Sequence, residues 1–142
     1  MKIIRFSDSG FSPQYQDYHL RSLIWPLLNY FYNRDFPLYS KARAIFSSNH
    51  QYFKRLAQFI YENEEDFEYG IWAFIDGHVN NASLNHLNKR VSVWKAEIPD
   101  HIYVYDVNLN EKYLITDKRA QFFGFFIPSK ELKFVSDVKK IG

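Results

Sequence analysis

Histidine and cysteine, the side chains that most often hold metals or act as nucleophiles, offer little chemistry in this sequence. Cysteine is absent, which excludes disulfides, thiolate zinc sites and a cysteine nucleophile. The five histidines are scattered, and the pair closest to a ligand-like spacing is His78 and His86, which we interpret as surface residues. No glycine-rich phosphate loop, nucleophile elbow or His-Glu-x-x-His motif occurs.

A second group of residues has a more specific pattern. Arg5 lies on the first expected strand, and the run Arg43–Ser48 ends in two serines before a helix rich in aromatic residues. The segment Tyr69–Trp72 follows, and the stretch Gln121–Val135 reads as an aromatic strand, a proline turn and a closing strand. This layout resembles the mono-ADP-ribosyltransferase-like fold. That family often has an early Arg or His, a hydroxyl motif at a strand end, and a catalytic Glu on a late strand.

The resemblance implies a protein that binds NAD and transfers ADP-ribose to a protein or a nucleic acid. Arg5 would hold the pyrophosphate through its forked guanidinium. Ser47 and Ser48 would position the nicotinamide ribose. Tyr52 or Phe53 would stack on a ring of the cofactor.

The catalytic carboxylate is where this sequence departs from that family. A carboxylate is needed to stabilise an oxocarbenium-like ribose, but the corresponding strand position is Gln121, which carries no charge. Glu111 or Glu131 could replace it only if the strand register differs. The catalytic candidates are therefore Gln121 and Glu111, and the constellation is incomplete.

Aromatic side chains point to a different class of function. They make up 20% of the chain, including 14 Phe and 11 Tyr, which is more than a core of this size buries. Some should therefore line a pocket or a protein-binding face. Candidates around the end of the first expected helix are Trp25, Tyr30, Tyr32, Arg34, Phe36 and Tyr39. The acidic run Glu62–Glu68 would steer a basic partner towards them.

Binding needs only a surface, whereas chemistry needs a complete site. The sequence therefore favours a small protein that binds and inhibits or neutralises a macromolecular partner, as immunity, inhibitor or phage anti-defence proteins do. An NAD-dependent mono-ADP-ribosyltransferase is the alternative. The first function requires no cofactor, and the second requires NAD. The identity of the target and the oligomeric state stay open.

Charge and hydropathy bear on location and partners. The net charge is +2 and the basic residues form no stripe, so we expect a protein partner and not a nucleic acid. No apolar run approaches the ~20 residues of a membrane span, and the first residues do not read as a signal peptide. We expect a cytoplasmic protein with no membrane contact.

The periodicity of apolar residues predicts helices early and strands late. The expected strands are Lys2–Phe6, Lys41–Ser47, Tyr69–Asp76, Val91–Ile98, Ile102–Val107, Gln121–Ile127 and Leu132–Val135. The expected helices are Tyr15–Asn33 with a kink at Pro26, one opened by a capping box at Ser48–Gln51, and a short one at Ala82–Lys89. Residues 1–142 thus read as a single α+β domain. Two or three N-terminal helices would pack on a mixed, mostly antiparallel sheet of about seven strands.

Overall fold

The fold combines one antiparallel sheet with a group of helices. A computed structural model describes residues 1–15, 24–32, 40–77, 92–106 and 108–141. The strands are β1 (Lys2–Phe6), β2 (Gly70–Ile75), β3 (Val93–Glu97), β4 (Tyr103–Tyr105), β5 (Lys112–Leu114), β6 (Phe125–Pro128) and β7 (Ser136–Lys140). Their order is β5-β4-β6-β2-β1-β3-β7, and each described pairing is antiparallel. The predicted α+β class is confirmed, and the sheet expected to be mixed and mostly antiparallel, with about seven strands, has seven described strands and antiparallel pairings.

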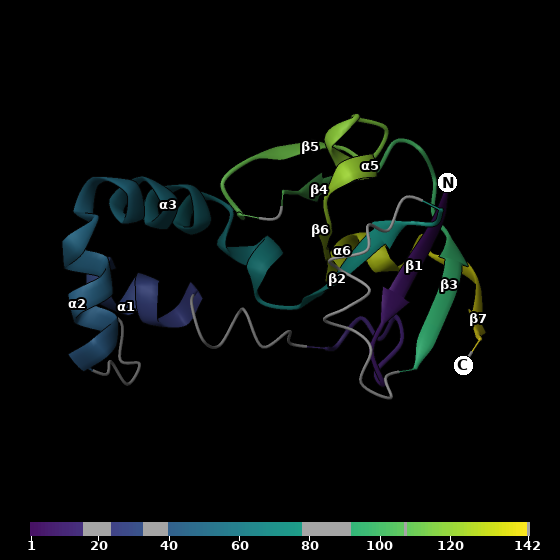
Figure 1. Cartoon of the computed structure of the whole chain (residues 1–142), viewed down its shortest axis with the longest axis horizontal. Helices are drawn as coiled ribbons and strands as arrows, with labels where there is room; N and C mark the ends of the chain where they lie inside the picture. The colour runs from purple at the N-terminus through teal and green to yellow at the C-terminus, as the bar shows by residue number, and fades with distance from the viewer. Residues whose placement is uncertain (16–23, 33–39, 78–91, 107, 142) are drawn as a thin grey trace.

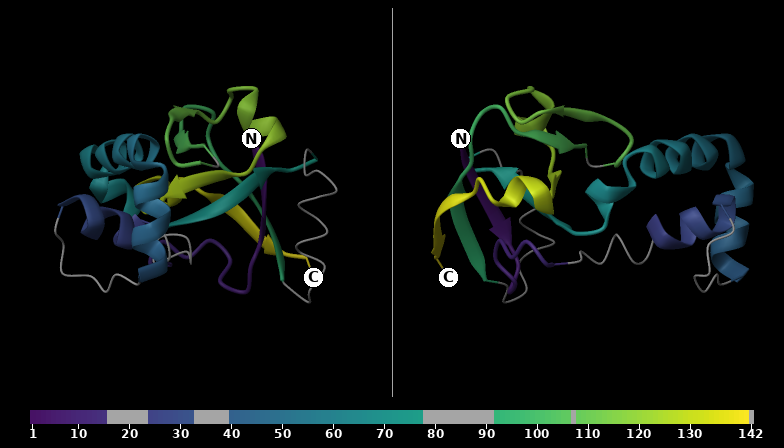
Figure 2. Two further views of the ribbon diagram at one scale, coloured as in Figure 1. Left: turned by 60° about the vertical axis from the view of Figure 1, so that its left-hand side comes forward. Right: turned by 180° about the vertical axis from the view of Figure 1, so that it is seen from behind.

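The helices of the described residues fall into two groups. The first contains α1 (Trp25–Tyr32), α2 (Ser40–Ser48), α3 (His50–Glu62) and the short 3₁₀ helix η2 (Glu64–Phe67), all between β1 and β2 in the chain. The second contains α5 (Arg119–Phe122) and α6 (Ser129–Leu132), which flank β6. The first group extends beyond one end of the sheet, with α2 farthest from β1 and β7 (Figures 1 and 2).

Strand β2 lies at the centre of the sheet and is covered on both faces, as its continuous apolar sequence predicts. Ile71, Ala73 and Ile75 point to one core, which also contains Ala120 of α5 and Leu132 of α6. The residues between these three, Trp72 and Phe74, face the other side of the sheet, because side chains alternate along a strand.

The second core joins the helices to the opposite face of the sheet. Trp72 of β2 and Phe126 of β6 pack there with ring centroids 5.8 Å apart. Leu56 and Ile60 of α3 and Phe67 of η2 complete it from the helical side. Helix α3 contributes through the apolar face predicted from its 3.6-residue period.

Helix α2 corrects the strand that the sequence predicted at Lys41–Ser47. Ala42 and Phe46 are four residues apart, and both pack into the helical core, as neighbours on one helix face do. The predicted capping box is also wrong, since Ser48 ends α2 and the N-cap of α3 is Asn49, which makes no side-chain capping bond. The chain turns at Asn49 from one helix directly into the next.

The C-terminal third contains three further corrections. The strand expected from Gln121 begins only at Phe125, because Gln121 belongs to α5. The strand expected at Leu132–Val135 is the end of α6 and a turn, and the closing strand is β7. Strand β5 had no predicted counterpart.

The other predicted helices and strands agree with the structure or lie outside the described residues. Strands β1, β2, β3 and β4 fall within their predicted ranges. Helix α1 begins next to Pro26, where a missing backbone N–H costs no helical bond. The first part of the predicted first helix, the helix at Ala82–Lys89, and both His78 and His86 lie outside the described residues. Within the described part of the chain, no helix has the length and apolar character needed to cross a membrane.

Candidate functional site

The acidic run between α3 and β2 is folded into η2, and this short element builds the candidate site. In a 3₁₀ helix, side chains three residues apart lie on the same face. Glu64 and Phe67 therefore share one face, and both line the same pocket. Asn63 holds the entry to η2, because its Nδ2 donates to the Phe59 carbonyl at 2.8 Å and its carbonyl accepts from the Asp66 N–H at 2.9 Å.

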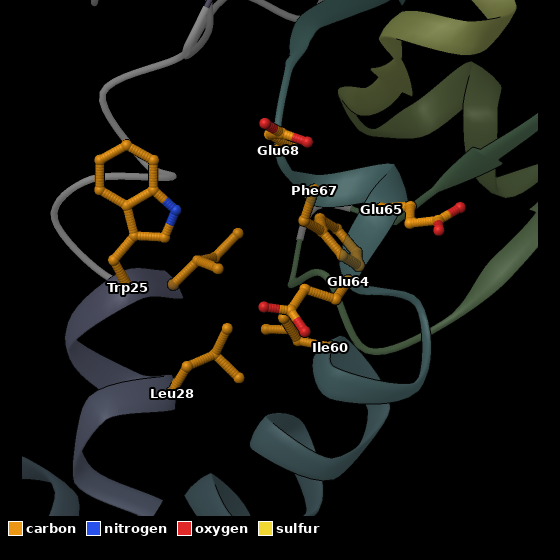
Figure 3. A pocket seen from close by; sticks show the side chains of 8 residues that line it. Trp25, Leu28, Ile60, Glu64, Glu65, Phe67 and Glu68 are labelled. Atoms are coloured by element: carbon orange, nitrogen blue, oxygen red, sulfur yellow. The ribbon is translucent and has the colours of Figure 1, made fainter. Parts of the chain in front are cut away.

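A pocket of about 440 Å³ lies between α1 and η2. Trp25 and Leu28 face it from α1, and Ile60 and Phe67 face it from the other side (Figure 3). The carboxylate of Glu64 points across the pocket towards α1 (Figure 3). The other lining residues described are Ile24, Glu65 and Glu68. We call this the acidic pocket, since its described lining joins an apolar floor to three glutamates and contains no basic side chain.

Asp66 is not part of the acidic pocket's lining and is 7% exposed. One of its carboxylate oxygens, Oδ2, accepts a hydrogen bond from the Tyr105 hydroxyl of β4. The other, Oδ1, lies 2.7 Å from Nζ of Lys130 on α6. Lys112 of β5 adds a longer contact of 3.9 Å to Oδ2. These four residues form the Asp66 network, which compensates the buried charge as a buried carboxylate requires.

The aromatic candidates from the sequence have several placements. Trp25 lines the acidic pocket. Tyr32 stacks on Tyr61 with ring centroids 4.4 Å apart, which ties α1 to α3. Tyr30 packs against Phe46 inside the helical group. Three further candidates, Arg34, Phe36 and Tyr39, lie outside the described residues. The structure thus brings one predicted aromatic residue together with the predicted acidic run.

Arg5, the predicted pyrophosphate ligand, is 3% exposed and held by neighbouring groups. Its Nε donates to the Gly10 carbonyl at 2.6 Å, and its two terminal nitrogens donate to the Trp72 carbonyl at 2.8 Å and the Ser9 hydroxyl at 3.1 Å. The guanidinium also lies over the Tyr15 ring. Arg5 therefore joins β1, the loop after it and β2.

The residues predicted to bind the nicotinamide ribose and to stack on a cofactor ring lie at the end of the molecule that is far from β1. Ser47 and Ser48 end α2, and their hydroxyls donate to the carbonyls of Ala44 and Ile45. Tyr52 is exposed and meets the edge of Phe53 on α3. Because β1 and α2 occupy opposite ends of the long axis (Figure 1), Arg5 and the two serines are not brought together.

Gln121 and Glu111, the catalytic candidates, belong to different segments, and the described link between those segments is Arg119 of α5. Glu111 is exposed and pairs with the Arg119 guanidinium, and Gln121 is on the same short helix as Arg119. Hydrogen bonds from Arg119 hold the pKa of the Asp117 carboxyl below its ordinary value. The Arg119 guanidinium thus pairs with the carboxylates of both Glu111 and Asp117. None of these three residues has a described contact with Arg5 or with α2.

Sequence reasoning missed the members of the Asp66 network. Asp66 lay inside the acidic run, where its neighbour Phe67 was the available signal that this part of the run turns inwards. Tyr105, Lys112 and Lys130 come from three different elements, and their spacing in the sequence gives no sign that they meet one carboxylate.

Comparison with known proteins adds no relative: searches against family models, curated proteins and solved structures return no match. Among the described residues, no cluster of His, Asp and Glu is arranged to hold a metal ion.

Proposed function

We propose that this chain binds a protein partner through the acidic pocket and thereby neutralises a basic, amphipathic segment of that partner. The observation that supports this most strongly is the combination of an apolar floor with three glutamates in one pocket. Its volume falls within the roughly 300–1,000 Å³ of ligand pockets. An apolar side chain of the partner would enter the floor, and a neighbouring Lys or Arg would meet the glutamates.

The chemistry of the lining decides the kind of partner. Trp25 offers a large, rigid contact, and tryptophan is enriched among residues that dominate binding energy. The carboxylates attract cations and speed the encounter with a basic segment. An amphipathic helix supplies both features, since its apolar stripe fits the floor and the basic side chains that border the stripe reach the glutamates.

The test is a binding titration with a short synthetic amphipathic helix of leucine and lysine. Its counterpart with glutamate in place of each lysine serves as the control peptide. We expect the basic peptide to bind and the acidic one not to. Calorimetry gives the dissociation constant, and the salt dependence reports the electrostatic part.

Paired variants distinguish binding by the pocket carboxylates from a general attraction between the acidic run and a basic peptide. Glu68→Gln removes one charge from the acidic pocket and none from any other described hollow, so it should weaken binding of the basic peptide about threefold or more. Glu62→Gln removes a charge from the same run, but Glu62 lines a hollow on the other side of η2, so it is the control. Equal effects of the two changes, or no binding by the wild-type chain, would contradict the proposal.

The transferase alternative stays a prediction, and an NAD titration tests it directly. Arg5 is unsuitable as the test variant, because its substitution removes three hydrogen bonds of the fold. Glu111→Gln is the better choice, since Glu111 is exposed. Loss of NAD-dependent transfer in that variant would support the alternative.

A further inference from the structure

The element η2 separates two hollows that share part of their lining. The acidic pocket lies on one side, and a second, more polar hollow of about 480 Å³ lies on the other. Glu64 and Glu65 line both. The second hollow also contains Asp66, Lys112 and Lys130. The orientation of η2 about its own axis therefore determines which carboxylates face which hollow.

Three consecutive carboxylates, Glu64, Glu65 and Asp66, could each supply the inward-facing acid. A 3₁₀ helix has three residues per turn, so a rotation of about 120° replaces each side chain by its neighbour. Phe67 packs on Tyr105 and Phe126 with ring centroids 4.5 and 5.6 Å away, which holds η2 against the sheet. Apolar contacts are not directional, so they do not determine which of the three carboxylates faces inwards. A polar contact has to do so.

The Asp66 network supplies that selection. Lys130 contacts Oδ1 at 2.7 Å and the Tyr105 hydroxyl donates to Oδ2, so both carboxylate oxygens of Asp66 are engaged from the sheet side. With Asp66 turned inwards, Glu64 points across the acidic pocket (Figure 3).

We propose that Lys130, through its ion pair with Asp66, is a positioning residue that sets the rotation of η2 and so keeps Glu64 facing the partner. Lys130 itself does not line the acidic pocket. This inference rests on the proposed function for its effect on binding, but the stabilisation of η2 by Lys130 is measurable without any ligand.

The test compares Lys130→Met with Lys133→Met. Both remove a lysine charge at α6, but Lys133 lies over the Phe134 ring and makes no described contact with Asp66. We expect Lys130→Met to weaken binding of the leucine–lysine peptide about fivefold, with Lys133→Met close to wild type. Lys130→Arg keeps a charged donor and should largely restore binding, which a general loss of stability would not reproduce.

A ligand-free measurement decides the inference independently. Backbone amide exchange of residues 63–68 should be faster in Lys130→Met than in wild type and Lys133→Met, at a temperature where all three are folded. Asp66→Asn should have the same effect, because it removes the ion pair and keeps an acceptor for Tyr105. Unchanged exchange in Lys130→Met would overturn the inference. Altered exchange with unaltered peptide affinity would overturn the link to binding, whereas failure of wild type to bind would overturn the proposed function.

Discussion

Tyr113 of β5 buries its hydroxyl without a hydrogen-bond partner among the described residues. Its ring is 4% exposed, and Arg119 lies 4.4 Å above the ring centroid. Tyr105 of β4, by contrast, donates a hydrogen bond from its buried hydroxyl to Asp66. Two tyrosines on paired strands therefore differ in what their hydroxyls contribute.

Phenylalanine substitutions separate these two roles. Tyr113→Phe should raise the free energy of unfolding by about 1 kcal/mol, because it removes an unsatisfied buried hydroxyl and keeps the ring under Arg119. Tyr105→Phe should lower it by about 2 kcal/mol, because it leaves Oδ2 of Asp66 without its donor. Urea denaturation at neutral pH measures both. Equal effects of the two substitutions would contradict this account.

Individual residues are also where sequence reasoning reached its limit. Arg5 was correctly placed on a strand, but a guanidinium that could grip a pyrophosphate fits equally well onto two carbonyls and a hydroxyl. The sequence singles out both Trp25 and the acidic run, yet their position across one pocket depends on how the helical group is packed. Residue type indicates what a side chain can do, and tertiary contacts decide which of these it does.

At the scale of elements, the predictions that succeeded rested on a clear run or period of apolar residues. Strand β1 with its adjacent isoleucines, the continuous apolar run of β2 and the amphipathic α3 were all located from sequence. Short elements were not. Helix α5 has four residues and β5 has three, which is too few for a period to emerge. The sequence of α2 predicts a strand because the helical pattern is weak: among its described side chains, Ala42 and Phe46 are those that pack into the core.

The pairing of β2 with β6 makes a prediction at this scale. Gly70 faces Pro128 across the two strands, and a Cβ there would lie 2.3 Å from the Phe126 ring and 2.6 Å from the Ile127 carbonyl. Gly70→Ala should lower the free energy of unfolding by about 2 kcal/mol or more, since relieving the clash would require the backbone of the paired strand to move. Thermal and chemical denaturation measure the loss.

Gly124→Ala provides the comparison for that substitution. Its nearest contact would be a ring atom of Phe74 at 3.1 Å, and a side chain adjusts more easily than a carbonyl. A Gly70→Ala variant as stable as Gly124→Ala would show that β2 and β6 are less closely paired in solution than in the structure.

The whole molecule should lose stability in alkaline solution through its buried tyrosines. Burial, together with the nearby Asp106 charge, raises the pKa of Tyr113 to about 12. Burial and the Asp66 contact raise the pKa of Tyr105 well above its ordinary value. A folded-state pKa above the unfolded value of ~10 means that the native state holds the proton more tightly. This contribution is complete below pH ~10 and is lost as the pH rises towards the folded-state values.

We therefore expect the free energy of unfolding to fall between about pH 10 and 12. The fall should be shallower in Tyr113→Phe than in wild type, because that variant lacks one of the two linked protons. Denaturant titrations at a series of pH values measure the two slopes. Identical slopes would show that Tyr113 ionises alike in the folded and unfolded chains.

The connection between β1 and β2 carries the whole first helical group, although the two strands are neighbours in the sheet. Ile3 pairs with Ile75, about half the chain away, and the other neighbour of β1, β3, comes later still. A ribosome adds about 5–20 residues per second, so β1 emerges several seconds before either neighbour exists. During that interval the helices, whose contacts are local, can fold first. The apolar strand ahead of them stays exposed, which makes the nascent chain a natural client for a chaperone.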